Sequence, residues 1–176
     1  ETRDYDLVVM ATGVNAKPFL LEGLKYIPPK TQTMTQDELQ VETTRIHPFP
    51  DNVAHAFLIP RSGLIAGCFV PKGSFLNVSV LNKTEQPISV SEFLQNEIVQ
   101  NTLQDRYERV CGCSPRVVIG SARHYYADGF VAVGDAAVSR LYKDGIGSAL
   151  RTAREAARTA AHHEFSRQAF RQTYQP

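Results

Sequence analysis

The segment Phe130-Val-Ala-Val-Gly-Asp-Ala-Ala137 constrains the fold of this chain more than any other stretch. A short apolar run ends there in Gly134-Asp135, and a second glycine-bearing segment, Lys143-Asp-Gly-Ile-Gly-Ser-Ala-Leu150, follows closely. The pattern predicts a buried strand, a tight turn that carries one carboxylate, and the N-terminus of an alanine-rich helix. Because backbone amides at a helix N-terminus attract phosphate and other polar groups, the segment predicts a binding site.

Composition limits the size of the protein and the kinds of partner it takes. A chain of 176 residues suits one domain, or one domain and a fragment of another. Nineteen basic residues nearly balance 18 acidic ones, so the net charge of +1 predicts neither nucleic acid nor an anionic membrane as partner. No stretch approaches the roughly 18 apolar residues of a membrane-spanning helix. Because the chain lacks an initial Met and enters a strand almost at once, we expect an excised piece of a longer protein.

The three cysteines, Cys68, Cys111 and Cys113, do not form a disulfide framework. They fit a reducing compartment, and we predict a cytoplasmic protein. The pair Cys111-Gly-Cys113 is compatible with metal binding or redox cycling, but we favour two free thiols in a turn before Pro115. We therefore predict no metal site.

The N-terminal part contains a second apolar run and a connector. The run at residues 6–11 is typical of a strand that is buried on both faces, and it ends at Thr12-Gly13, where glycine permits a close backbone turn. Prolines at 18, 28 and 29 interrupt regular structure and indicate a crossing between domains.

The middle of the chain predicts an antiparallel sheet followed by a helix. Three strand-like runs at residues 52–59, 63–70 and 74–81 are separated by turn signals, and the third has strict period-two alternation. Ser89-Val-Ser-Glu92 is a capping box, and apolar residues then recur at helical spacing, so we expect one helix that ends near Cys111-Gly112. Later, Ala149, Ala153, Ala156 and Ala160 fall on one helical face, which predicts close packing of that face against a sheet.

Taken together, residues 131–137, residues 144–149 and the alanine-rich helix resemble the C-terminal flavin motif of the glutathione-reductase-type FAD superfamily. More narrowly they resemble its p-hydroxybenzoate hydroxylase branch, and the strand that ends in Thr12-Gly13 is similar to the superfamily's ATG motif. The stretch from Pro60 through Pro71-Lys-Gly73 to Asn77-Val78 resembles geranylgeranyl reductases, which use FAD to saturate isoprenoid double bonds. The superfamily's first motif, GxGxxG on a βαβ unit, does not occur in this chain.

The resemblance implies the roles of particular residues. Asp135 would bind the ribityl chain of FAD, and Gly134 and Ala136 would line its diphosphate and ribityl region. The loop that begins at Asp144 would lie along the flavin ring through Gly145, Ile146 and Gly147, while Thr12 and Gly13 would support the cofactor from the neighbouring strand. Substrate contacts would come from Phe69, Lys72, Asn77, Arg140 and Tyr142. No catalytic side chain is predicted.

These observations define the predicted fold and function. We expect an α/β (α+β) protein in which residues 28–128 form a substrate-binding domain, an antiparallel sheet with a helix. Residues 1–27 and 129–176 would form part of an FAD-binding domain, whose missing N-terminal half would be the main partner. The resemblance implies a fragment of an FAD-dependent oxidoreductase, inactive alone, which reduces an apolar, isoprenoid-like molecule by hydride transfer through flavin N5. NAD(P)H is the candidate electron donor, and a lipid-like substrate would bring the protein to a membrane surface.

Two alternatives to this function stay open. One is a flavin monooxygenase or halogenase of the same superfamily, in which reduced FAD meets oxygen. The other is a non-catalytic binding module that keeps a flavoprotein-like scaffold.

Overall fold

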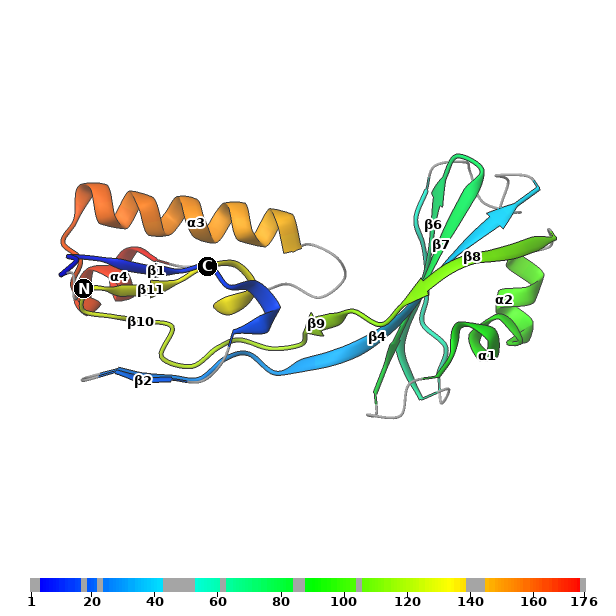
Figure 1. The fold of residues 1–176 in the computed structure, drawn as a ribbon, viewed down its shortest axis with the longest axis horizontal. Helices are drawn as coiled ribbons and strands as arrows, with labels where there is room; N and C mark the ends of the chain where they lie inside the picture. The colour runs from blue at the N-terminus through cyan, green and yellow to red at the C-terminus, as the bar shows by residue number, and fades with distance from the viewer. Residues whose placement is uncertain are drawn as a thin grey trace. The chain divides into compact units, whose positions relative to one another are not determined.

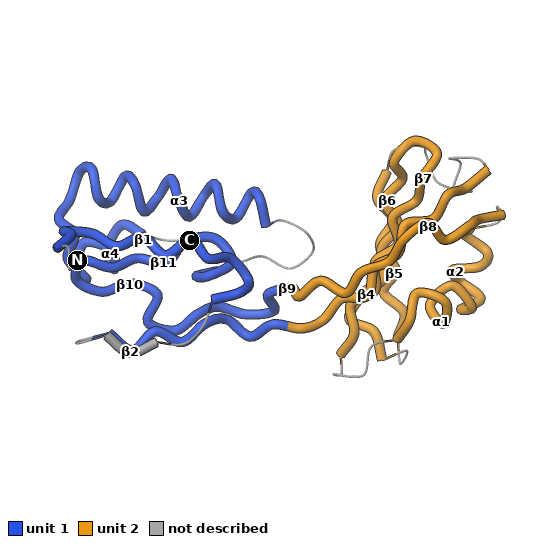
Figure 2. The backbone as a smooth tube through the Cα atoms, in the orientation of Figure 1, with its two compact units in different colours: residues 1–31, 118–176 blue, residues 32–117 orange. Residues whose placement is uncertain are grey.

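The structure is a computed structural model that describes residues 4–16, 19–21, 24–42, 53–60, 63–83, 88–103, 106–138 and 145–174; of residues 19–21 it describes the backbone only. The chain divides into two compact units, residues 1–31 with 118–176 (unit 1) and residues 32–117 (unit 2) (Figure 2). Both helices and a mainly antiparallel sheet are present, which confirms the predicted α+β class. Unit 2 lies within residues 28–128, for which we predicted the substrate-binding domain, and the domain boundaries themselves stay a prediction.

Unit 1 contains a three-stranded sheet with the strand order β1-β11-β10 (Figure 1). Strand β1 (Val8–Met10) pairs in parallel with β11 (Phe130–Ala132), and β11 pairs antiparallel with β10 (Tyr126–Ala127). The other elements of this unit are the hairpin β2 (Phe19–Leu21) and β3 (Leu24–Tyr26), the short 3-10 helices η1 (Gly13–Asn15) and η2 (Gly134–Ala136), and the α-helices α3 (Gly145–His162) and α4 (Arg167–Thr173).

Strand β11 lies between two apolar clusters, as its continuous apolar sequence predicts. Phe130 and Ala132 pack with β3 in one cluster, and Val131 packs with α3 and α4 in the other. The prediction for β1 was wrong in one respect. Val8 and Val9, which point to opposite faces of the strand, are 49% and 52% exposed, because the described residues place no strand beyond β1 at this edge.

The buried face of α3 also differs from the predicted alanine face. Ala149 and Ala153 are exposed, and the face that packs inward carries Ser148, Thr152, Ala156 and Thr159. Hydroxyl groups are tolerated there because the helix itself satisfies them. Thr152 Oγ1 donates to the carbonyl of Ser148 at 2.8 Å, and Thr159 Oγ1 donates to the carbonyl of Glu155 at 2.9 Å.

Unit 2 is built on a six-stranded sheet. Five strands follow the order β5-β6-β7-β4-β8, and β9 also pairs with β4. Their bounds are β4 Thr31–Val41, β5 His55–Phe57, β6 Leu64–Lys72, β7 Phe75–Asn82, β8 Tyr107–Cys113 and β9 Arg116–Val118. Strands β5, β6 and β7 form the predicted meander, which is confirmed.

Two short helices, α1 (Val90–Leu94) and α2 (Glu97–Thr102), replace the single long helix that the sequence predicted. The capping box is confirmed, because Ser89 Oγ accepts the amide of Glu92 while the Glu92 carboxylate accepts the amide of Ser89. The predicted continuation to residues 111–112 was wrong. Asn96 caps a second helix, and residues 107–113 form β8, which pairs with β4. Among the described residues, no helix is both long enough and apolar enough to cross a membrane.

The two faces of the unit 2 sheet have different characters. The inner face packs against α1 and α2 in one core cluster, which includes Leu39, Phe69, Val78 and Phe93. We call the opposite side the outer face. Strand register and alternation place on it Gln36, Glu38, Cys68, Val70, Lys72, Phe75, Asn77, Ser79, Cys111 and Cys113.

Candidate functional site

The carboxyl ends of β1 and β11 bring two predicted segments together. Because these strands are parallel and adjacent, their following turns leave the sheet side by side, and Val133 donates its amide to the carbonyl of Met10 at 3.0 Å. Thr12 and Gly13 follow β1, whereas Gly134-Asp135-Ala136 forms η2 after β11, and the two 3-10 helices are in contact. The structure therefore unites five of the predicted cofactor residues at one edge of the sheet.

The start of α3 completes this site. Helix α3 begins at Gly145 and contacts η2, and a Cβ atom added to Gly145 would lie 3.8 and 3.9 Å from the two carboxylate oxygens of Asp135. Gly147 is half-buried in the first turn, and the side chain of Ile146 is 89% exposed. Asp144, Arg140 and Tyr142 lie outside the described residues.

Asp135 has an unusual environment. Its Oδ1 atom is buried, and the described part of the chain offers it no hydrogen-bond partner. The carboxylate lies beside the N-terminus of an 18-residue helix, whose first amides lack intrahelical acceptors and carry partial positive charge. A buried oxygen without a partner is costly unless something else satisfies it, so this atom is a candidate acceptor for a ligand's hydroxyl group.

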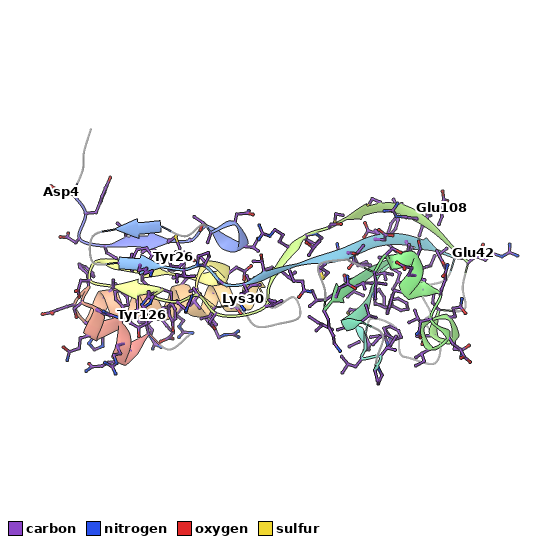
Figure 3. All side chains as sticks on the ribbon, turned by 90° about the horizontal axis from the view of Figure 1, so that it is seen from below. Asp4, Tyr26, Lys30, Glu42, Glu108 and Tyr126 are labelled. Carbon is purple, nitrogen blue, oxygen red and sulfur yellow. The ribbon has the colours of Figure 1, made fainter. Side chains whose placement is uncertain are left out.

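Three side chains that sequence reasoning missed hold this turn in place. Tyr26 donates its hydroxyl to the carbonyl of Ala136, and Tyr174 donates its hydroxyl to the carbonyl of Ala132 at 2.8 Å. Gly134 has a φ of +61°, and its amide donates to Thr152 Oγ1 at 2.7 Å in a buried hydrogen bond. Figure 3 labels Tyr26, which is 1% exposed. These residues fix the backbone on both sides of Asp135.

We predict that replacing Thr152 by valine lowers the free energy of unfolding by about 1–3 kcal/mol. Valine has nearly the same shape but offers no acceptor, so the buried amide of Gly134 loses its partner. Urea denaturation followed by circular dichroism measures the change. Thr152→Ser, which keeps the hydroxyl, should cost about 1 kcal/mol or less. Equal costs for the two variants would contradict this role of the hydroxyl.

Burial raises the pKa of Tyr26 to about 12, and it raises the pKa of Tyr174 and of Tyr125 as well. The folded-state pKa lies above the unfolded value of about 10, so the protonated tyrosines contribute their full stabilisation of the folded state below about pH 10. It is lost as the pH rises through the folded-state pKa. We therefore expect the free energy of unfolding to fall between about pH 10 and 12, and the Tyr26→Phe, Tyr174→Phe variant to show a shallower fall. An identical pH dependence in the variant would rule out these tyrosines as the cause.

The predicted substrate residues separate onto the two faces of the unit 2 sheet. Lys72 and Asn77 lie on the outer face, where Lys72 Nζ is 3.5 Å from Glu38 Oε1. Asn77 is 3% exposed, and its Oδ1 atom lies 3.1 Å from Ser79 Oγ, which is also 3.2 Å from Gln36 Oε1. Phe69 is fully buried in the inner core, so the structure does not bring it together with the other two.

A groove of about 310 Å³ lies at the end of β4 and β8, where Figure 3 labels Glu42 and Glu108. It is lined by Gln40, Val41, Glu42, Arg106, Tyr107 and Glu108. None of the predicted site residues lines it. The described residues contain no group of three or more histidine, cysteine or acidic side chains that could hold a metal ion.

Comparisons with known proteins identify the fold. No protein-family model and no curated protein matches the chain. Among solved structures, the flavin-dependent brominase Bmp2 matches 95% of this chain and 46% of its own, with 16% identity and a TM-score of 0.67. The myxobacterial chondrochloren halogenase CndH is described as a variant of FAD-dependent halogenases. Its match covers 95% of this chain and 42% of CndH, with 14% identity and a TM-score of 0.61. The match with the flavin-dependent halogenase CmlS covers 88% of this chain and 30% of CmlS, with 16% identity and a TM-score of 0.60.

These likenesses establish the fold alone, because all the identities are far below 25%. The chain has the fold of a part of the flavin-dependent halogenases and spans less than half of their length. The expected resemblance to flavin-dependent enzymes is confirmed at the level of fold, and the resemblance to geranylgeranyl reductases stays a prediction.

Proposed function

We propose that this chain is the part of an FAD-dependent flavin monooxygenase or halogenase that contributes the substrate sheet and one half of the flavin site. The single observation that carries the proposal is the buried Oδ1 of Asp135, which has no hydrogen-bond partner among the described residues, at the junction of β1, β11 and α3. It occurs in a fold that is shared with flavin-dependent halogenases.

The residues at this junction fit FAD. The Asp135 carboxylate would accept a hydrogen bond from a ribityl hydroxyl, which would satisfy the orphaned oxygen. Backbone at Gly134 and Ala136 would line the ribityl and diphosphate region, and the first amides of α3, from Gly145 to Gly147, would face the ring's polar edge. Apart from its chain neighbours, no described residue has an atom within 4 Å of the Cβ position of Gly13, so a cofactor could approach its backbone closely. When bound, FAD would supply the redox chemistry, with NAD(P)H as the candidate electron donor.

The outer face of unit 2 is the proposed substrate wall. It combines apolar surface at Val70 and Phe75 with a hydrogen-bonding amide at Gln36 and a cation at Lys72. This mixture suits a small, largely apolar molecule with one polar substituent. Under the monooxygenase or halogenase interpretation the substrate is aromatic. The cytoplasmic location stays a prediction.

We propose the rest of the flavoprotein as the main partner of unit 1. Strand β1 is an edge of its sheet, and both of its faces are half-exposed at Val8 and Val9. Ile146 and Leu150 of α3 are 89% and 70% exposed. A parallel strand with its helix would cover these apolar groups and supply the first nucleotide-binding motif. We expect this chain alone to be inactive for that reason.

Reduction of an isoprenoid-like double bond is the second candidate function. The Pro71-Lys-Gly73 segment and Asn77 carry the resemblance to geranylgeranyl reductases, and Lys72 and Asn77 share the outer face. In that case a lipid-like substrate would bring the protein to a membrane surface.

The test uses the intact parent protein. We expect it to purify yellow with FAD, to consume oxygen with NAD(P)H, and to convert an electron-rich aromatic compound to a hydroxylated product, or to a halogenated product when chloride or bromide is present. Oxygen-independent saturation of a prenyl substrate would support the reductase instead. A colourless protein that stays colourless after incubation with FAD would overturn both functions and leave a non-catalytic binding module.

A further inference from the structure

The motif Cys111-Gly112-Cys113 has no role in the proposed flavin site. It does not lie in a turn, as the sequence suggested, but in β8, whose seven residues are all exposed. Cys111 pairs with Glu38 and Cys113 with Gln36, so both thiols project from the outer face of the sheet. Strand β8 lies at the end of the strand order, and both thiols are free and exposed. A reagent in solution therefore reaches both sulfur atoms.

The spacing of the two cysteines disfavours a disulfide between them. Two residues of extended strand separate the Cβ atoms by about 6.7 Å. A disulfide needs Cβ atoms about 3.8 Å apart. The strand would have to shorten locally by about 2.9 Å, which requires residue 112 to bulge away from the thiols toward the inner face.

An ion pair on the inner face opposes that movement. Asp37 is 6% exposed, and its carboxylate accepts two hydrogen bonds from Arg109, at 2.9 Å from Nε and at 3.0 Å from Nη2. The pair lies directly against Gly112, where even one added Cβ atom would overlap the guanidinium and the carboxylate. A bulge at residue 112 would displace this ion pair, and the ladder with β4 also holds β8 extended and the two thiols apart.

A bridging atom removes this mismatch. A metal–thiolate bond is about 2.3 Å long, so a linear sulfur–metal–sulfur unit spans about 4.6 Å, against about 2.05 Å for a sulfur–sulfur bond. The metal bridge thus lengthens the sulfur–sulfur span by about 2.5 Å. This gain is close to the 2.9 Å or so by which the Cβ–Cβ distance in the strand exceeds that of a disulfide. Thiolates select soft ions such as Cu(I). Zinc prefers four ligands, and the described residues hold no group of even three.

We propose that Cys111 and Cys113 form a two-coordinate clamp for a soft monovalent cation, Cu(I), on the outer edge of the unit 2 sheet. Binding exchanges two thiol protons for the metal ion and involves no change of oxidation state. Glu38 contributes no ligand, since its Oε2 atom lies 3.9 Å from Cys111 Sγ and serves as a weak acceptor of the thiol.

The test is anaerobic titration of the 176-residue chain with Cu(I) in competition with bicinchoninate. We expect one Cu(I) per chain, with affinity lowered at least about a hundredfold in Cys111→Ser and in Cys113→Ser, because a single thiolate loses the second, intramolecular ligand. Cys68→Ser is the matched control and should bind like the unchanged chain. Circular dichroism verifies that each variant is folded.

Three outcomes would overturn the clamp. The first is binding by either single variant that equals binding by the unchanged chain. The second is Zn(II) binding that depends on the same two cysteines with similar affinity. The third is closure of a Cys111–Cys113 disulfide by oxidised glutathione, seen by mass spectrometry, that is as fast in the folded chain as in urea. None of these measurements depends on flavin, so the clamp and the proposed function fail separately.

Discussion

Replacing Phe69 by alanine should lower the free energy of unfolding of this chain by about 3–5 kcal/mol, the usual cost of removing a buried phenylalanine from a packed core. Phe69 has no exposed surface, and its ring lies edge-to-face with Phe57 and Phe93, at centroid distances of 4.8 and 6.0 Å. Repacking is limited on one side, because the ring of Phe93 rests directly on Gly67, where a Cβ atom would overlap it. Urea denaturation followed by circular dichroism measures the loss.

Phe75→Ala is the matched control for this prediction. Phe75 lies in the same sheet, but on the outer face and only partly buried, so its removal should cost less than half as much. If the outer face binds substrate, Phe75→Ala should instead weaken substrate binding by the intact protein. Equal stability losses for the two variants would contradict the assignment of faces.

The strands of unit 2 were predictable because apolar residues face one side of the sheet and mostly polar residues face the other. The alternation of Leu76, Val78 and Val80 with Phe75, Asn77 and Ser79 gave both the strand and its two faces, and the register with β4 confirms them. The face of Phe69 was not predictable in this way. Its position opposite Val78 depends on where the β6–β7 hairpin turns. The resemblance to geranylgeranyl reductases grouped it with Lys72, which lies three positions away on the same strand and points to the other face.

Strand β8 shows a different limit of sequence reasoning. Apolar residues at helical spacing run from Phe93 to Tyr107, and that local pattern supported one long helix. Residues 107–113 instead pair with β4, about 70 positions earlier in the chain, and no local signal reports that partner. Asn96, which caps α2 by accepting the amide of Ile98 at 3.0 Å, was the available sign of a break.

The candidate site was predictable where backbone pattern determines it. Apolar runs that end in Thr12-Gly13 and Gly134-Asp135 located the two strand ends, and the glycines after residue 144 located the start of α3. The supporting side chains were not predictable. Thr152 looks like an interruption in an alanine-rich helix until its hydroxyl is seen to accept the amide of Gly134. The alanine positions therefore predicted the wrong face of α3.

Replacing Asp135 by alanine should separate cofactor binding from folding. In the intact parent protein we expect FAD affinity to fall about 10–150-fold, since a hydrogen bond to a charged acceptor is worth about 1.5–3 kcal/mol. In this chain the free energy of unfolding should stay within about 0.5 kcal/mol or rise. The variant loses a negative charge beside the N-terminus of α3, and that interaction is worth about 0.3–1 kcal/mol. It also removes a buried oxygen that no described residue satisfies, and this gain offsets the loss.

Asp128→Ala provides the opposite control in the same unit. The Asp128 carboxylate accepts the amide of Arg167 at 2.6 Å at the start of α4, so its loss should cost about 1 kcal/mol of stability. FAD affinity should not change, because Asp128 follows β10 and precedes β11, away from the carboxyl ends of β1 and β11. Flavin fluorescence titration of the intact protein and urea denaturation of this chain measure the two quantities. If Asp135→Ala destabilises the chain and leaves FAD binding unchanged, Asp135 is an N-terminal charge partner of α3, and the flavin assignment loses the observation on which it rests.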